Sequence, residues 1–309
     1  MIRANFFIIG APKCGTTSVA AWLSQHADVF MSSPKEPRFF NADWTFPFRI
    51  ADLEAYTALF AEAGDRRVIG EATTGNLVSD VAVPSIIEYQ PEARFVVCLR
   101  DPVELFFSLH RQRLKEGNET LSDPADAWDA QLERLQQGHN VPRGVADPKS
   151  LHYDRFCRLG TQMDRLYSWV PRERVFVILM EELRDEPDAT FRALCRFLDI
   201  EGYSLPDYAV ENAGRLPKSV RLQNMLRLGG LIKKRIGLPS MGIASRISRA
   251  NLSGVLKSSD PVLRAKLVDH FAQEVYLLEQ VLGRDLGRWR DVSSGAIGSK
   301  AKSGLRPEL

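Results

Sequence analysis

The chain has 309 residues, of which 44% are hydrophobic and 26% are charged, and its formal net charge is +2. This composition is typical of a globular protein with a large core, and the near-neutral charge excludes the overall basic bias of many nucleic-acid- and membrane-binding proteins. The four cysteines show no paired spacing, and the N-terminal apolar run NFFIIG is too short for a signal peptide or a membrane span. We therefore expect a soluble, cytoplasmic protein without disulfides and without a nucleic-acid partner.

Short apolar runs predict buried strands, and the amphipathic segments between them predict helices. In chain order, the expected strands span 5–10, 66–71, 93–100 and 174–180, and the expected helices span 16–26, 81–89, 101–114, 187–198 and 261–282. This alternation indicates an α/β fold with a mostly parallel sheet flanked by helices on both faces. Since the sequence has no repeats and no strong linker, we expect a single domain over 1–292 and a disordered tail at 293–309.

The segment IIGAPKCGTTS joins the first predicted strand to the first predicted helix. Its two glycines have the spacing of a phosphate-binding P-loop, but its lysine lies inside the loop, at Lys13, and Thr16 stands where a magnesium-dependent kinase would carry the lysine. The backbone N–H groups of 15–18 open a helix, whose positive end favours an anion. A strand–helix turn with a chance lysine is the alternative. Because no convincing acidic metal site accompanies the loop, we expect a phosphate site that works without a metal.

The segment VVCLRDPVELFFSLH contains a second candidate anion site. Arg100 ends a buried strand, and Ser108 follows about two helical turns later. The loops after residues 10, 70 and 99 should meet at one edge of a parallel sheet, where the ligands of such folds bind. Alone, Arg100 could equally pair with a neighbouring acid, and Ser108 could be an ordinary helix serine. Combined with the first loop, the pattern predicts a second phosphate site.

Both motifs resemble those of sulfotransferases that use 3′-phosphoadenosine 5′-phosphosulfate (PAPS). GAPKCGTTS resembles the 5′-phosphosulfate loop of that family, and LRDPVELFFSLH resembles its 3′-phosphate element. PKEPRFF at 34–40 is similar to the lysine–glutamate stretch of the heparan-type and bacterial branches, and the resemblance extends over about 5–290. It implies metal-independent, in-line transfer of a sulfuryl group from PAPS to a hydroxyl or amine, with adenosine 3′,5′-bisphosphate as the second product.

The resemblance also implies roles for individual residues. Lys13 would stabilise the leaving phosphate, and Arg100 and Ser108 would hold the 3′-phosphate. Glu36 matches the general base of the heparan-type branch, and His110 is a second candidate for that role. The 5′-phosphate would be held by Lys13 together with Cys14, Gly15, Thr16, Thr17 and Ser18.

The chemistry agrees with these roles, because the acceptor must lose a proton as the new bond forms and the leaving oxygen gains negative charge. Glu36 could instead be a solvated loop acid between two prolines, and His110 could be a surface histidine on a helix. Cytosolic steroid- and phenol-type members of the family place a histidine base between the two phosphate elements. Residues 70–99 contain no histidine, which favours Glu36.

Two positions depart from the family pattern. Ala72 follows the strand-end Glu71 where a lysine is common, which affects how acceptor and sulfate are held, and Leu105 replaces a common arginine in the 3′-phosphate element. Two rival functions therefore stay open: a metal-dependent P-loop kinase or nucleotidase, and a non-catalytic nucleotide-binding module.

The segment 212–259 contains ten Lys or Arg residues and no Asp or Glu. It could close over the cofactor, recognise an acidic glycan or an anionic lipid surface, or form a solvated basic face. Its resemblance to the family makes Arg215, Lys218 and Arg221 cofactor-binding candidates, and LIKKRIG at 231–237 is our candidate for contact with the acceptor or a membrane. The acceptor itself, whether small molecule, lipid or glycan, is not specified, although the aromatic residues of 39–48 could line its site or pack under a loop.

Overall fold

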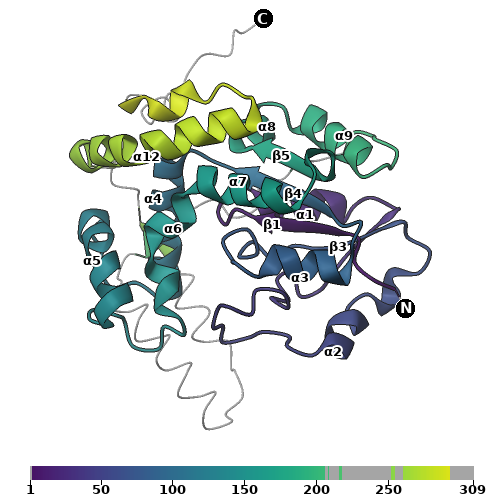
Figure 1. The fold of residues 1–309 in the computed structure, drawn as a ribbon, viewed down its shortest axis with the longest axis horizontal. Coiled ribbons are helices and arrows are strands. Elements are labelled where there is room, and N and C mark those ends of the chain that lie inside the picture. Colours follow the sequence, from purple (N-terminus) through teal and green to yellow (C-terminus); the bar gives the residue numbers. More distant parts are fainter. Residues whose placement is uncertain (1, 206–207, 209–215, 218–251, 255–259, 293–309) are drawn as a thin grey trace, which may run out of the picture.

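Five parallel strands form the main sheet of the protein, in the order β2-β3-β1-β4-β5 (Figure 1). The computed structural model describes residues 2–205, 208, 216–217, 252–254 and 260–292. The strands are β1 (Phe6–Gly10), β2 (Val29–Met31), β3 (Val68–Glu71), β4 (Arg94–Leu99) and β5 (Val175–Leu179). The predicted α/β fold with a parallel sheet is confirmed. Only β2 was not predicted, because a run of three residues carries too little periodicity.

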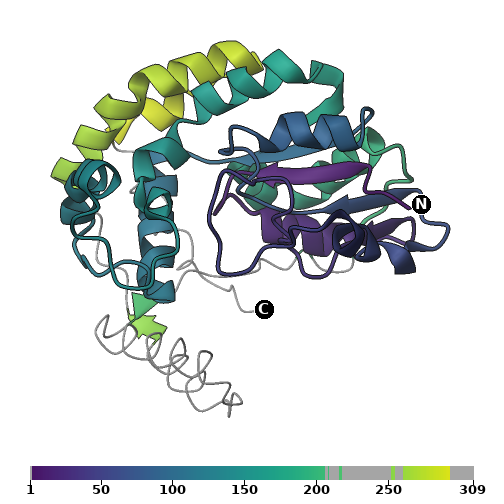
Figure 2. The same cartoon turned by 60° about the horizontal axis from the view of Figure 1, so that its bottom comes forward.

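Helices cover both faces of this sheet. Figure 2 shows the purple helix α1 on one face and α3 with α7 on the other, and α12 packs along α7. The helices that match predicted segments are α1 (Thr16–Leu23), α3 (Ala82–Tyr89), α4 (Pro102–Glu116), α9 (Pro187–Phe197) and α12 (Pro261–Leu282). The further helices are α2 (Leu53–Ala58), α5 (Pro124–Gln137), α6 (Tyr153–Cys157), α7 (Leu159–Trp169) and α8 (Met180–Asp185).

The central strand β1 is buried along its whole length. Phe6 lies opposite Gly70 of β3 on one side and opposite Arg94 of β4 on the other. At the end of the strand, a Cβ on Gly10 would lie 2.6 Å from the Cβ of Leu77, whose backbone N–H donates to the Ile9 carbonyl at 2.8 Å. Glycine is therefore needed where the chain leaves the sheet, because the loop after β3 passes directly over this position.

Several sequence-based predictions concern residues that the structure does not describe. The basic segment 212–259 lies outside the described residues except for two short strands, β6 (Leu216–Pro217) and β7 (Leu252–Gly254), which pair antiparallel. The tail 293–309 also lies outside them, so the single domain over 1–292 stays a prediction. Among the described helices, none is both long enough and apolar enough to cross a membrane.

Candidate functional site

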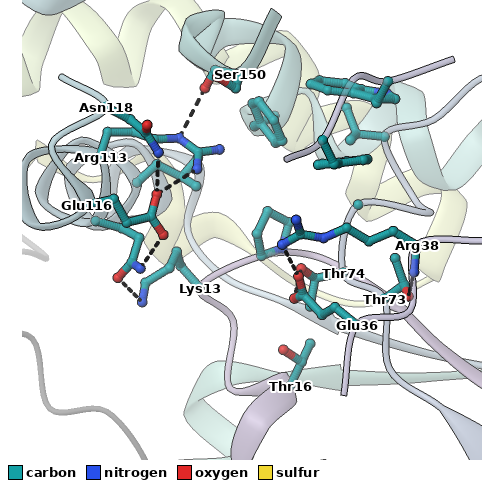
Figure 3. Close-up of a pocket in the computed structure, with 18 of the residues that line it drawn as sticks. Lys13, Thr16, Glu36, Arg38, Thr73, Thr74, Arg113, Glu116, Asn118 and Ser150 are labelled. Atoms are coloured by element: carbon teal, nitrogen blue, oxygen red, sulfur yellow. Dashed lines mark hydrogen bonds and ion pairs between the residues drawn. The ribbon is translucent and has the colours of Figure 1, made fainter. Parts of the chain in front are cut away.

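A cavity of about 730 Å³ opens at the carboxyl edge of the sheet. The β1–α1 loop, the loop after β2, the loop after β3 and the helix α4 all contribute to its wall (Figure 3). The prediction that the loops after residues 10, 70 and 99 meet at one edge is confirmed. Most of the predicted site residues line this one cavity: Lys13, Gly15, Thr16, Thr17, Ser18, Glu36, Arg100 and Ser108.

The β1–α1 loop has the geometry of an anion-binding helix start. Gly15 caps α1 in the left-handed conformation, with φ of 87°, and no side chain caps the first turn. A side chain at this position would be strained, and its Cβ would also lie 2.5 Å from the Leu183 side chain. Thr16, Thr17 and Ser18 of the first turn of α1 line the cavity. An anion bound there would lie at the helix start, where backbone N–H groups can donate to it.

Lys13 reaches from this loop toward α4. Its Nζ donates to Oε1 of Gln112 at 3.3 Å, and Gln112 in turn donates to Glu116 at 2.6 Å (Figure 3). Burial lowers the pKa of Lys13, and the charges of Lys115 and Arg100 lower it further. An anion in the cavity would oppose both effects, as the charge of Glu116 already does in part.

The residues at the start of α4 and along it bring two predicted site residues, Arg100 and Ser108, to the cavity, together with Arg111, which was not predicted. Asp101 caps the helix by accepting from the Val103 N–H at 2.8 Å, which explains why an acid follows this strand. Arg100 pairs with Glu104 at 3.3 Å, and Ser108 lines the cavity. Arg111, one helical turn after Ser108, lines it too. Burial and the charge of Arg100 lower the pKa of Arg111. The i,i+3 spacing from Ser108 was the signal that could have identified it.

Glu36 is held in place by two hydrogen-bonding partners. Its Oε1 accepts from the Thr74 hydroxyl at 2.9 Å, and its Oε2 pairs with Arg38 at 2.9 Å (Figure 3). The side chain is 30% exposed, and that exposure is toward the cavity. Glu36 is thus a positioned carboxylate at the cavity wall, unlike the freely solvated loop acid that was the alternative.

A second carboxyl lies beneath this loop. Glu71 is fully buried at the end of β3 and accepts from Thr73 at 2.9 Å and from Asn76 at 3.2 Å. Burial raises the pKa of Glu71 to about 8. Because Glu71 does not line the cavity, its contribution is to hold the loop that carries Thr74 against Glu36.

The far wall of the cavity is aromatic. Trp44 and Phe46 line it and come from the segment 39–48, together with Phe156 of α6, whose ring lies 5.4 Å from that of Trp44. Phe40, in contrast, packs against Tyr56 beneath the loop at 5.2 Å. Part of the segment therefore packs under the loop, as one interpretation has it, whereas the acceptor site at the part that lines the cavity stays a prediction.

Two predicted residues do not line the cavity. Cys14 is fully buried, and its thiol faces the Pro12 carbonyl. His110 is 3% exposed, and its Nε2 lies 2.9 Å from the Leu121 carbonyl. The alternative of a surface histidine is therefore wrong. His110 lies two positions after Ser108 and so on a different face of α4, which residue type alone does not reveal.

Other predictions concern cysteines, metals and the basic segment. All four cysteines are free and buried. Within the described part of the chain, no group of three or more His, Cys, Asp or Glu side chains could hold a metal ion. The cofactor candidates Arg215, Lys218 and Arg221 lie outside that part.

Comparisons with known proteins find similarity to sulfotransferases. A family model described as "Sulfotransferase family" matches residues 56–204. The crystal structure of a sulfotransferase from Alicyclobacillus acidocaldarius superposes with a TM-score of 0.72 and 26% identity, over 94% of this chain and 100% of that one.

Curated relatives match over shorter stretches. Carbohydrate sulfotransferase 15 of Rattus norvegicus is 30% identical over 146 residues, which cover 34% of this chain and 26% of the relative. Membrane-associated sulfotransferase kil1 of Dictyostelium discoideum is 28% identical over 124 residues, which cover 40% of this chain and 26% of the relative. The chain thus spans about a quarter of the length of these relatives. In sequence over 56–204 and in structure over nearly its whole length, this chain is thus similar to sulfotransferases.

Proposed function

We propose that this chain transfers a sulfuryl group from PAPS to a hydroxyl or amine acceptor, in line and without a metal. The observation that carries the proposal is the meeting of two anion-binding groups in one cavity. One is the start of α1 with Lys13, and the other is the set of Arg100, Ser108 and Arg111 on and before α4. Two separated phosphate-binding groups fit a nucleotide that carries phosphates on both its 3′ and 5′ oxygens.

The residues of the cavity suit the charges of such a donor. The 5′-phosphate would accept hydrogen bonds from the N–H groups of 15–18, and the 3′-phosphate would pair with Arg100 and Arg111. The lowered pKa values of Lys13 and Arg111 support this fit, because both reflect buried positive charge without enough negative charge nearby.

Transfer then needs one base and one cation on the leaving group. Lys13 and Glu36 approach the cavity from two sides, with Thr16 between them (Figure 3). As the acceptor oxygen bonds to sulfur, Glu36 takes its proton and the bond from sulfur to the phosphate oxygen breaks. Lys13 releases its hydrogen bond to Gln112, binds that phosphate instead and stabilises its negative charge. We assign the base to Glu36 rather than His110, because His110 has no access to the cavity.

The acceptor would enter along the aromatic wall of Trp44, Phe46 and Phe156. A glycan is one candidate class, since one relative is named a carbohydrate sulfotransferase, and small hydroxylated molecules and lipids are the others. The cytoplasmic location and the contact of 231–237 with an anionic surface also stay predictions. Fractionation of cells and vesicle binding would test them.

Calorimetric binding of adenosine 3′,5′-bisphosphate in the presence of a chelator tests the proposal directly, with ATP–magnesium as the comparison. We expect metal-independent binding that weakens in Arg100→Ala. A preference for ATP with magnesium would replace the proposal with the kinase alternative. Binding without turnover of PAPS, even by water, would favour the non-catalytic module.

A further inference from the structure

Lys35 is a cavity cation that the mechanism above does not use. It is half-buried, lines the cavity, and its Nζ donates to the Thr17 hydroxyl at 3.2 Å. Thr17 belongs to the loop proposed for the 5′-phosphate, and the residue after Lys35 is the proposed base, Glu36. Lys35 therefore joins the two parts of the site between which the sulfuryl group would move.

The backbone around Lys35 is fixed by the end of β3. The Ser32 N–H donates to the Gly70 carbonyl at 2.9 Å, and the Ala72 N–H donates to the Lys35 carbonyl at 3.3 Å. These bonds extend the pairing of the sheet by a few residues beyond β2. The ammonium group thus projects from a positioned segment, as precise placement of a charge requires.

Lys35 forms no ion pair with a carboxylate among the described residues. Glu36 pairs with Arg38 instead. Burial lowers the pKa of Lys35, and the charge of Glu36 partly opposes that shift. A half-buried cation whose hydrogen-bonding partner is a neutral hydroxyl is costly unless a bound anion completes its surroundings.

We infer that Lys35 is a second catalytic cation, which binds the non-bridging sulfuryl oxygens of the donor while Lys13 binds the leaving phosphate. The inference rests on the proposed function. In the transition state, the sulfur is bonded partly to the acceptor oxygen and partly to the phosphate oxygen, and its other three oxygens carry negative charge. Lys35 stabilises that charge and keeps its own proton, since the acceptor proton goes to Glu36.

The test compares two ligands that differ only in the sulfuryl group. PAPS contains it, and adenosine 3′,5′-bisphosphate does not. We expect Lys35→Met to bind the bisphosphate within about twofold of the wild type and to bind PAPS on the order of tenfold more weakly, the loss typical of one charged hydrogen bond. Release of bisphosphate from PAPS, with water as the acceptor, should fall on the order of 10²-fold. Lys35→Arg should recover much of this rate, because it restores the charge.

Two controls make the result decisive. Lys266→Met removes an exposed lysine of α12 that pairs with Asp129 at 2.9 Å, and should leave binding and rate unchanged. Thermal unfolding of Lys35→Met confirms that the variant is folded. Equal loss of affinity for both ligands, or an unchanged rate in Lys35→Met, would overturn the inference and leave the proposed function standing. If the wild type binds neither ligand, the proposed function fails and the inference falls with it.

Discussion

The proposed donor half and the proposed acceptor half of the cavity are built in different ways. The donor half consists of the β1–α1 loop and the first turns of α4, and each of these is one continuous stretch of sequence. The proposed acceptor half brings Glu36, Phe46, Thr74 and Phe156 together from three separate segments. Backbone N–H groups and helix geometry create the first, whereas side-chain hydrogen bonds between loops create the second. Single substitutions should therefore affect the two halves differently.

Substitution of the proposed base should have the largest effect. Glu36→Gln keeps the shape of the side chain and its bond from Thr74, but it cannot take the acceptor proton. Once an acceptor has been identified, its turnover should fall on the order of 10³-fold, within the range for general-base catalysis. The affinity for the bisphosphate should stay unchanged. Glu88→Gln, on an exposed site of α3, is the matched control. Weakened bisphosphate binding would mean that Glu36 shapes the donor half as well.

Loss of Lys13 should be nearly as severe. Lys13→Ala removes the charge that stabilises the leaving phosphate, so release of bisphosphate from PAPS should slow on the order of 10²- to 10³-fold. Gln112→Ala provides the informative companion. This variant removes the hydrogen-bonding partner of Lys13. The rate should stay within about threefold of the wild type, because the 3.3 Å hydrogen bond is weak and a tenfold change in rate needs about 1.4 kcal/mol. A near-normal rate in Lys13→Ala would refute its assigned role.

Arg111 should contribute to binding more than to rate. Arg111→Ala removes one cation from the proposed 3′-phosphate site and should weaken bisphosphate binding by about 1.5 to 3 kcal/mol, as expected for a hydrogen bond to a charged group. Calorimetry at two salt concentrations checks this, and the salt dependence should also decrease. Arg192→Ala, at an exposed position of α9 paired with Asp188, is the control. An unchanged affinity would limit the 3′-phosphate site to Arg100 and Ser108.

The last prediction concerns stability rather than the reaction, through Glu71 and the loop after β3. Because burial raises its pKa to about 8, the folded protein holds this proton at pH values where the unfolded chain has lost it. The contribution of Glu71 to stability is therefore complete at low pH and declines as pH rises through about 8. The slope is at most about 1.4 kcal/mol per pH unit. Denaturant unfolding between pH 5 and 9 should show this decline in the wild type, and Glu71→Gln should remove it. An identical slope in both proteins would contradict the assignment.

Much of this molecule could be predicted from its sequence. Four of the five strands and the helices at α1, α3, α4, α9 and α12 follow from runs and periodicities that act over a few residues. The same is true of the loop around Gly15, since a glycine there satisfies a positive φ and leaves N–H groups for an anion. Arg100 and Ser108 were identified because one ends a strand and the other lies on the helix that follows directly, so a short window of sequence contains both.

Tertiary structure decided the rest. Which side chains of α4 face the cavity depends on how this helix is rotated against its neighbours. The sequence shows only that Arg111, and not His110, shares a helix face with Ser108. Lys35 meets Thr17 because the segment after β2 continues along the end of β3. Ala72, where the family pattern suggests a lysine, donates to the backbone of that same Lys35. Contacts of this kind join residues far apart in the chain, and their geometry depends on packing that no short window of sequence encodes. The sequence alone therefore determined four of the five main strands and suggested the phosphate loop and its reaction class, whereas the surroundings of Glu36 and Lys35 depend on the assembled sheet edge.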